Sequence, residues 1–354
     1  MPFARVARVT RGGLPESWHL GAAAALTPDG QVAACLGDPA LATFLRSAAK
    51  PFQILPLLLA GGEARFGLES ADLALICASH AGTPAHTARA ARLLEKGGFE
   101  AGDLLCGAHP PYDPESARRL EESGEAPTAL HNNCSGKHAG MLLACRLLGF
   151  DPGRYTEPDH PLQRRILGEL ARACRLDAGE IALGTDGCSV PAFRLPLAAA
   201  ARGYAALADP FAAGLDAERQ RVLARVAGAM TAAPEMVSGP GRFTTRLMEV
   251  GAGGVVAKEG AEGVFAVAVR GPAPLGIVVK IADGGERCRD GVVLEILRQL
   301  GALAEPALVE LDAFSRPLVH NWRGIQVGEV VPEPELVRSD TAPSGEASGR
   351  GSLP

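Results

Sequence analysis

The pattern of hydrophobic and polar positions favours strands at both ends of the chain. Near the start, "HLGAAAALT" and "QVAACLG" flank "PDG", a hairpin signal in which Asp29 and Gly30 supply the turn. Apolar runs of strand length return after residue 250, in "GGVVAKEG", "GVFAVAVRG" and "LGIVVKIADGG", and again near "IQVGEVV". Strands from the two ends can pair, so we expect one antiparallel sheet built from both termini.

Helical spacing dominates between these strands. Apolar residues recur every three and four positions in "HTARAARLLEKGG", "HPLQRRILGELARACRL" and "DAERQRVLARVAGAM", and a further helix, "RDGVVLEILRQLGALA", follows the C-terminal strands. We therefore predict a mixed α/β fold with a sheet-containing lobe (1–40 and 251–338) and a helical lobe (41–250). The small polar residues of 339–354 predict a disordered tail.

Composition narrows the class of protein. The chain has 354 residues, of which 47% are hydrophobic, and a net charge of −5, which leaves no basic face for nucleic acid or anionic lipid. The most apolar stretch, "FQILPLLLAGG", is short and interrupted by Pro56, and no signal peptide is evident. Eight cysteines without a C-x-x-C indicate free thiols or isolated ligands. We expect a cytoplasmic protein, away from membranes, that acts on small molecules.

Lysine is rare in this chain, which makes each lysine informative. Of 35 basic residues only five are lysines, at positions 50, 96, 137, 258 and 280. Arginine stays protonated in proteins, whereas a lysine can lose its proton and then act as a base or a metal ligand. Lysines within polar motifs are therefore candidates for chemistry.

Ser47 and Lys50 form the first candidate pair. In "LRSAAKPFQ" the serine lies three residues before the lysine at the head of an apolar helix, so the hydroxyl and the amine share one helical face. A neutral Lys50 there could take the serine proton. The alternative is a helix cap with an exposed lysine.

Two further motifs extend this pattern. Ser79 ends a buried segment in "CASHAGTPAH", and Lys258 lies on a predicted strand just before a glycine in "VVAKEGAEG". A serine, a second serine and a strand lysine occur in this order in the penicillin-recognising serine hydrolases, with signatures S-x-x-K, S-x-N and K-T-G. Here the second motif is S-H-A and the third K-E-G, so the match is mainly one of order. The alternatives are a helix terminus for Ser79 and a solvated strand position for Lys258.

A metal site is the third candidate. Cys134, Lys137 and His138 lie close together in "LHNNCSGKHAGML", and Asp186 and Cys188 occupy a glycine-rich turn in "LGTDGCSVPAFRLPL". If the cysteines meet, they and the lysine offer two sulfurs and a nitrogen to zinc, with a fourth place for water or substrate. Neutralising a lysine at pH 7 costs on the order of 4 to 5 kcal/mol, so such a site should be weak and should lose metal in acid. The alternatives are two unrelated buried cysteines, an ordinary helix-start histidine and a turn aspartate.

Seven blocks together resemble the asparaginase II family, bacterial amidohydrolases unrelated to the threonine-nucleophile asparaginases. The blocks are "RGGLPESWHLG", "RSAAKPFQ", "CASHAGTPAH", "NNCSGKHAGML", "GTDGCSVPAF", "SGPGRFTTRLM" and "AKEGAEGVFAVAVR". The resemblance covers most of the chain short of the tail. It implies a serine β-lactamase-like fold with a large helical insertion, and the hydrolysis of L-asparagine to L-aspartate and ammonia.

The resemblance also implies catalytic roles. Ser47 matches the family's nucleophile and Lys50 its base, and Ser79 with Lys258 matches a second serine-lysine pair in the same pocket. The family further implies a homodimer. Its members can carry a cysteine where this chain has Thr244.

The same resemblance implies roles for the residues of the candidate metal site. Cys134, Lys137 and Cys188 match ligands of a weak zinc ion that modulates substrate binding, and His138 and Asp186 match residues lining the substrate pocket beside it. Asp186 suits the substrate ammonium. We add Arg242 or backbone amides as candidates for its carboxylate.

Two alternatives to an asparaginase remain. A glutaminase, or a hydrolase of β-lactam or ester substrates on the same fold, has no evident need for the polar metal turn. A non-catalytic zinc or amino-acid binding protein would explain Cys134, Lys137 and Cys188, but it leaves the serines and the other lysines of the motifs unexplained.

Overall fold

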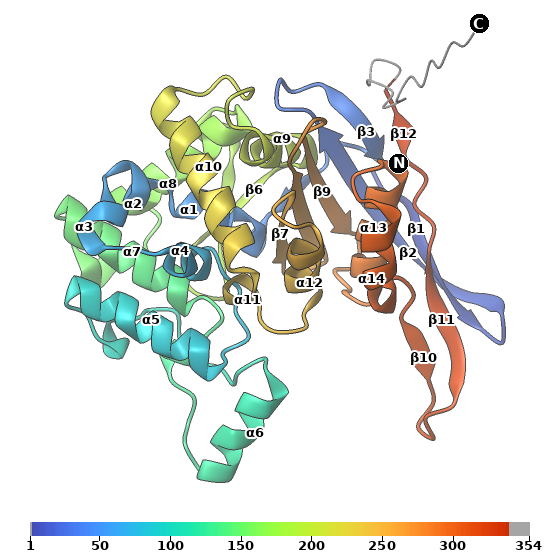
Figure 1. Ribbon diagram of the computed structural model, residues 1–354, viewed down its shortest axis with the longest axis horizontal. Helices are drawn as coiled ribbons and strands as arrows, with labels where there is room; N and C mark the ends of the chain where they lie inside the picture. Colours follow the sequence, from blue (N-terminus) through green and yellow to red (C-terminus); the bar gives the residue numbers. More distant parts are fainter. Residues whose placement is uncertain (1, 340–354) are drawn as a thin grey trace, which may run out of the picture.

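Both ends of the chain join in one large antiparallel sheet in the computed structural model, which describes residues 2–339 (Figure 1). Its order is β10–β11–β1–β2–β9–β8–β7, with β3 also paired to β2 and β12 paired to β3. The strands are β1 Ala4–Arg11, β2 Leu14–Leu26, β3 Val32–Leu36, β7 Val255–Gly260, β8 Val264–Val269, β9 Leu275–Ile281, β10 Leu318–His320, β11 Gln326–Pro332 and β12 Val337–Arg338. This confirms the prediction of a mixed α/β fold whose sheet joins the two termini.

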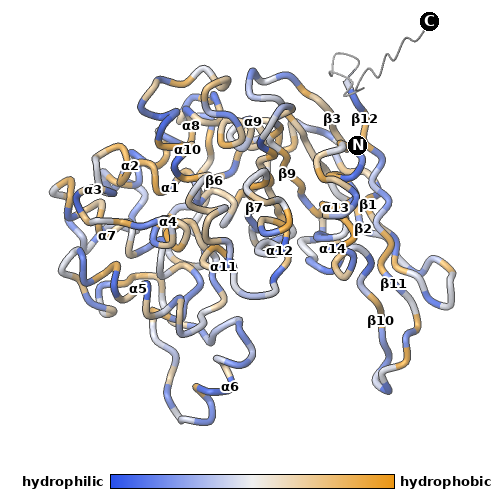
Figure 2. The backbone as a smooth tube through the Cα atoms, in the orientation of Figure 1, coloured by the Kyte–Doolittle hydropathy of each residue, from blue (hydrophilic) through white to orange (hydrophobic). Residues whose placement is uncertain are grey.

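The centre of this sheet is covered by helices. Every residue of β7 and β8 is buried, and since successive side chains of a strand point to opposite faces, both faces must be covered. Helix α9 (Leu197–Ala208) packs against β2, β8 and β9, α12 (Phe243–Val250) against β7, and α13 (Arg289–Gln299) against β8 and β11. Figure 2 shows hydrophobic backbone where β9 crosses the middle of the molecule.

The middle of the chain is largely helical, and the helices predicted by spacing are present as α5, α8, α10 and α13. Helix α5 begins with Pro84 after the cap Thr83 and ends at Gly98, whose φ of 71° suits a glycine. The helix bounds not yet given are η1 Arg46–Ala49 (a 3-10 helix), α1 Lys50–Gln53, α2 Leu55–Leu59, α3 Gly62–Phe66, α4 Ser70–Ile76, α5 Pro84–Gly97, α6 Pro114–Ser123, α7 Ser135–Leu148, α8 Pro161–Cys174, α10 Ala217–Ala232, α11 Pro234–Val237 and α14 Glu305–Glu310.

The sequence did not predict a second, smaller sheet within the helical region. Its order is β4–β6–β5, from β4 (Ala42–Phe44), β5 (Ala182–Thr185) and β6 (Pro191–Pro196). The sequence "LGTDGCSVPAF" indicated the glycine-rich turn between β5 and β6. Strands of three to six residues carry too few positions for a period to show, so only the pairing reveals this sheet.

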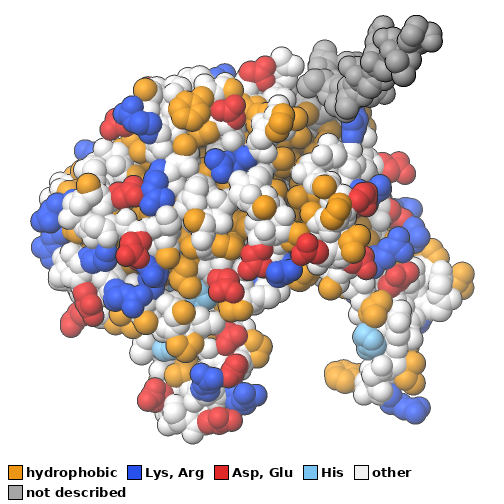
Figure 3. All heavy atoms as spheres, in the orientation of Figure 1, with side chains coloured by type: hydrophobic (Ala, Val, Ile, Leu, Met, Phe, Trp, Pro, Cys, Tyr) orange, Lys and Arg blue, Asp and Glu red, His pale blue; other side chains and the backbone are white. Residues whose placement is uncertain are grey.

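Two segments extend from the body on the same side of the view, α6 and the hairpin β10–β11 (Figure 1). Basic and acidic side chains are intermixed on the face drawn in Figure 3. Within residues 2–339 no helix has both the length and the apolar character needed to cross a membrane. The predicted disordered tail falls on 340–354, outside the described residues, except for Ser339, whose N–H donates to Ala33 O at 3.1 Å.

Candidate active site

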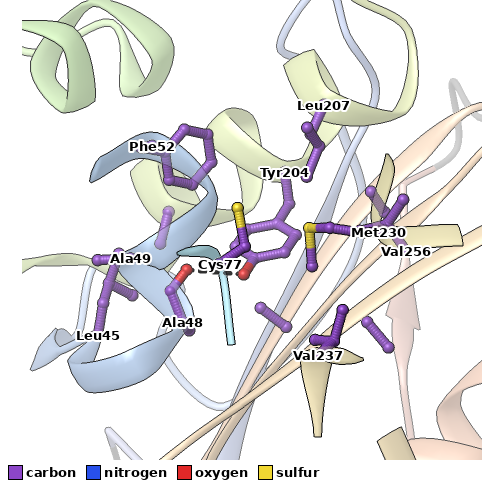
Figure 4. Close-up of a cluster of buried hydrophobic side chains, with 14 of the residues drawn as sticks. Leu45, Ala48, Ala49, Phe52, Cys77, Tyr204, Leu207, Met230, Val237 and Val256 are labelled. Carbon is purple, nitrogen blue, oxygen red and sulfur yellow. Dashed lines mark hydrogen bonds between the residues drawn. The ribbon is translucent and has the colours of Figure 1, made fainter. Parts of the chain in front are cut away.

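Ser47 lies in η1, a short helical turn that leads directly into α1. Arg46 just before it has a φ of 51°, a left-handed conformation that is unfavourable for a residue with a side chain and that clusters at functional sites. The hydroxyl of Tyr204 on α9 donates to Ala48 O at 2.7 Å, and Phe52 packs edge-on against the Tyr204 ring (Figure 4). The buried core thus holds the turn that carries Ser47.

Two buried lysines converge on Ser79. Lys50 Nζ donates to Ser79 Oγ at 3.0 Å, and Lys258 Nζ donates to the same oxygen at 2.9 Å. Lys50 is 1% exposed and Lys258 0%, so the alternatives of an exposed lysine and a solvated strand residue are wrong. A hydroxyl oxygen has two lone pairs, so with both lysines donating, the Ser79 hydroxyl is free to donate its own proton.

The pKa of Lys258 is lowered from 10.5 to about 8. Burial is the main cause, the charge of Lys50 adds to it, and the carboxylate of Glu259 opposes it. With a pKa of about 8, about a tenth of Lys258 is the neutral amine at pH 7. The structure therefore provides a lysine that can act as a base near neutral pH.

A cavity of about 310 Å³ adjoins these groups, and both Ser47 and Ser79 line it. The full lining is Ser47, Ser79, Tyr112, Asn133, Arg242, Glu259, Gly260, Ala261 and Glu286. Within residues 2–339 the Ser47 hydroxyl has no hydrogen-bond partner, and Lys50 is bonded to Ser79 instead. A larger surface hollow, of about 460 Å³ between α2 and α8, contains none of the predicted site residues.

The residues of the predicted metal turn are brought together. Cys134 precedes the first turn of α7, Lys137 lies in that turn, and Cys188 lies between β5 and β6. Lys137 Nζ donates to Cys188 Sγ at 2.8 Å, and all three side chains are buried. The alternative of two unrelated cysteines is therefore wrong.

The pKa values of the two thiols of this cluster shift in opposite directions. A hydrogen bond from Cys188 and the charges of Lys50 and Lys137 outweigh burial and lower the pKa of Cys134, whereas the same bond and burial raise the pKa of Cys188. Burial disfavours the ammonium of Lys137, but the two sulfurs outweigh it and raise its pKa above the usual value. The start of a helix also favours a thiolate.

Asp186 and His138 lie near this cluster but do not line the cavity. Asp186 Oδ1 accepts from Arg46 Nε at 2.9 Å, and burial is outweighed by the charges of Lys137 and Arg46, which lower the pKa of Asp186. His138 is 0% exposed, its Nδ1 is 2.7 Å from the Tyr155 hydroxyl, and burial lowers its pKa. His138 Nε2 is buried without a partner within residues 2–339.

Sequence reasoning missed Glu259, the most strongly perturbed carboxylate of the cavity. Burial disfavours its charge, but Lys258 and Arg242 outweigh burial and lower the pKa of Glu259 to about 2. Thr244 Oγ1 donates to Glu259 Oε2. The available signal was a glutamate directly after Lys258 in the otherwise apolar segment VVAKEG. Arg242 itself lines the cavity, as expected for a substrate-binding residue.

The chain was compared with solved structures, curated protein sequences and family profiles. Among solved structures, "Crystal Structure Analysis of Mglu" is 17% identical and "Crystal Structure Analysis of Mglu in its glutamate form" 16%, with TM-scores of 0.34 and 0.36. Each alignment covers 80% of this chain, and 67% and 61% of those chains. No curated protein sequence matches. A family profile described as L-asparaginase II matches residues 7–332, so the chain belongs to the L-asparaginase II family.

Proposed function

We propose that the protein is an amidohydrolase that converts L-asparagine to L-aspartate and ammonia through an acyl-enzyme on Ser47. The observation that carries this proposal is the meeting of two buried lysines at Ser79, in the cavity that Ser47 also lines. A serine activated by an adjacent amine is a sufficient nucleophile for amide hydrolysis. Family membership supports an amide substrate, and a serine β-lactamase-like topology is part of the same proposal.

The reaction proceeds in two halves. Ser47 Oγ bonds to the side-chain amide carbon while its proton passes to a neutral lysine amine, directly to Lys50 or by way of Ser79. The amide nitrogen takes up a proton and leaves as ammonia, which produces the ester. Water then attacks the ester carbon, releases L-aspartate and restores the Ser47 hydroxyl. The first backbone N–H groups of a helical turn lack partners within it, so those at the start of η1 are the candidates for stabilising the oxyanion.

Zinc is proposed as a weak ligand of the cysteine-lysine cluster. Among the described residues no group of three His, Cys, Asp or Glu side chains could hold a metal, so Cys134 and Cys188 need Lys137 as a third donor. Their proximity and their two sulfurs suit zinc. Lys137 must lose a proton before it can bind zinc, and the two sulfurs raise its pKa. Zinc binding should therefore be weak. Bound zinc would supply a positive charge at Cys134, the neighbour in sequence of the cavity-lining Asn133.

Ammonia release from L-asparagine and L-glutamine, with and without added zinc, tests the function. Activity on glutamine alone would indicate a glutaminase, and an inert folded protein would indicate a binding protein. Lys50→Arg keeps the charge but removes the neutral form, so turnover should fall at least about a hundredfold. Lys96→Arg is the control, because within residues 2–339 Lys96 bonds only to the carbonyls of Phe66 and Gly67 and pairs with Asp72. A folded Lys50→Arg protein with near wild-type turnover would rule out Lys50 as the base and leave the route through Ser79 to Lys258.

A further inference from the structure

Arg242 presents an unsatisfied donor at the candidate active site. Its side chain lines the cavity, and its Nη1 atom is buried without a hydrogen-bond partner among residues 2–339. Its guanidinium carbon lies 5.9 Å from the centre of the Tyr112 ring, which restricts its orientation. A buried charged donor without a partner is costly, so the position suits an anionic group of a ligand.

Glu259 presents the opposite charge in the same lining. Its carboxylate accepts from Thr244 Oγ1 and from Ser238 Oγ at 3.3 Å, and its Oε1 forms an ion pair with Lys258 Nζ at 3.1 Å. An ionised carboxylate has about four acceptor positions, so these contacts leave acceptor capacity for a ligand. The surrounding cations keep it ionised at any pH at which the protein would work.

The residues first expected to hold the amino-acid end are engaged elsewhere. The charge of Asp186 is paired with Arg46, whose Nη2 lies 2.8 Å from Asp186 Oδ1. His138 is fully buried beside Tyr155. Neither belongs to the lining shared by the two serines. Within that lining, a ligand ammonium can meet the buried carboxylate of Glu259.

We propose that Glu259 binds the α-ammonium of the substrate and Arg242 its α-carboxylate, so that the two side chains select a zwitterionic amino-acid end beside the serines. This rests on the proposed function, because it places an amino-acid amide in the cavity that Ser47 lines. A ligand that lacks either charge leaves one of the two side chains unpaired, which discriminates against it. Thr244 is a positioning residue that fixes the carboxylate of Glu259.

Three small ligands separate the two contacts. L-Aspartate carries both groups, succinate lacks the α-ammonium, and β-alanine lacks the α-carboxylate. Their dissociation constants are measured by calorimetry for the wild type and for Glu259→Gln and Arg242→Gln. Glu259→Gln should raise the dissociation constant of aspartate about 10- to 100-fold, which is the range of a charge-assisted hydrogen bond. It should raise that of succinate less than about threefold. Arg242→Gln should raise the dissociation constants of aspartate and succinate by similar factors and leave that of β-alanine unchanged.

Matched controls lie on the surface of α12. Arg246 is paired with Glu249 there, so Arg246→Gln and Glu249→Gln remove the same charges without reaching the cavity and should change each constant less than about twofold. If Glu259→Gln loses the same affinity for aspartate as for succinate, the proposal is overturned, because Glu259 would then act only through Lys258.

The wild-type protein provides a test that needs no folded variant. If it binds aspartate no more tightly than succinate, the paired recognition is wrong even if asparagine is hydrolysed. If it prefers aspartate at least about tenfold to both analogues but releases no ammonia from asparagine, the recognition stands and the proposed function fails.

Discussion

Ser79 is the residue at which the two lysines of the site meet, whereas the Ser47 hydroxyl has no hydrogen-bond partner in the described part of the chain. A hydroxyl held by two lysines is suited to relay protons, because it can accept from one amine and donate to another group. Ser47, half-buried at a strained turn and facing the cavity, is suited to attack a substrate. The two serines are therefore expected to respond differently to the same substitution.

Ser47→Ala should reduce asparagine turnover to background and prevent any acyl adduct, since the attacking oxygen is gone. Ser79→Ala should lower turnover by about 10² to 10⁴, the range of a proton-transfer contribution, yet still allow a slowly formed adduct. Mass spectrometry of the quenched protein detects the adduct. Ser123→Ala, on α6, is the control. If Ser47→Ala forms the adduct and Ser79→Ala does not, then Ser79 is the nucleophile and Ser47 the proton relay.

The rate should depend on pH through Lys258. Its neutral form is the active one, so kcat/KM should rise with pH and level off above about 8. Glu259 raises the pKa of Lys258, so in Glu259→Gln the rise of kcat/KM should occur at lower pH. A pH profile of ammonia release, measured on the wild type and this variant, checks both expectations. If kcat/KM rises at the same pH in the variant as in the wild type, another group controls the rate.

At the scale of elements, α9 packs directly onto β9. A side chain added at Gly276 of β9 would lie 1.9 Å from Ala201 O and 2.1 Å from Ala205 N on α9. Gly276→Ala should therefore lower the free energy of unfolding by about 1 to 3 kcal/mol or more, measured by denaturant unfolding. Gly228→Ala on α10 is the control, because nothing lies within 4 Å and alanine favours a helix. Similar stabilities for the two variants would contradict this close packing.

The zinc prediction concerns two elements, the start of α7 and the turn between β5 and β6. Neither serine is a metal donor, so the metal-stripped protein should still hydrolyse asparagine, with a raised KM and nearly unchanged kcat. Cys188→Ala should bind no zinc in metal analysis, and lowering the pH should release zinc because its donors take up protons. Loss of kcat at saturating asparagine after chelation would instead place the metal in the chemical step.

At the scale of the whole molecule, exposed apolar side chains lie on two neighbouring hairpins of the large sheet, β1–β2 and β10–β11. On β1–β2 they include Trp18, 48% exposed, and on β10–β11 Leu318 and Trp322, 51% and fully exposed. These hairpins are neighbours, since Gly12 N donates to Val327 O at 2.9 Å. Such a patch favours association with another molecule.

The homodimer predicted from the family is expected to use this surface. Sedimentation should give twice the mass of the chain, and the double variant Leu318→Asp, Trp322→Asp should give a monomer. Val309→Asp is the control, because Val309 is 71% exposed on α14. A monomeric wild type would show the homodimer prediction to be wrong. The division into lobes and the cytoplasmic location likewise stay predictions.

The sequence by itself determined the local elements and the chemical inventory of the site. The hairpin at the start, the successive strands after residue 250 and the long amphipathic helices depend on short-range periodicity, which each segment contains in full. The motifs around Ser47, Ser79, Cys134 and Lys258 likewise named the residues and the family, because residue types at fixed spacing are visible without a fold.

Only the tertiary structure decided how these residues are partnered. Lys258 and Ser79 are 179 positions apart, and no local pattern indicates that both lysines meet at that hydroxyl. The pairing of Arg46 with Asp186 and the presence of Glu259 in the cavity follow from the same long-range packing. Burial also sets the pKa values of Lys258 and Glu259, because the cost of a charge depends on the groups that the whole fold places around it.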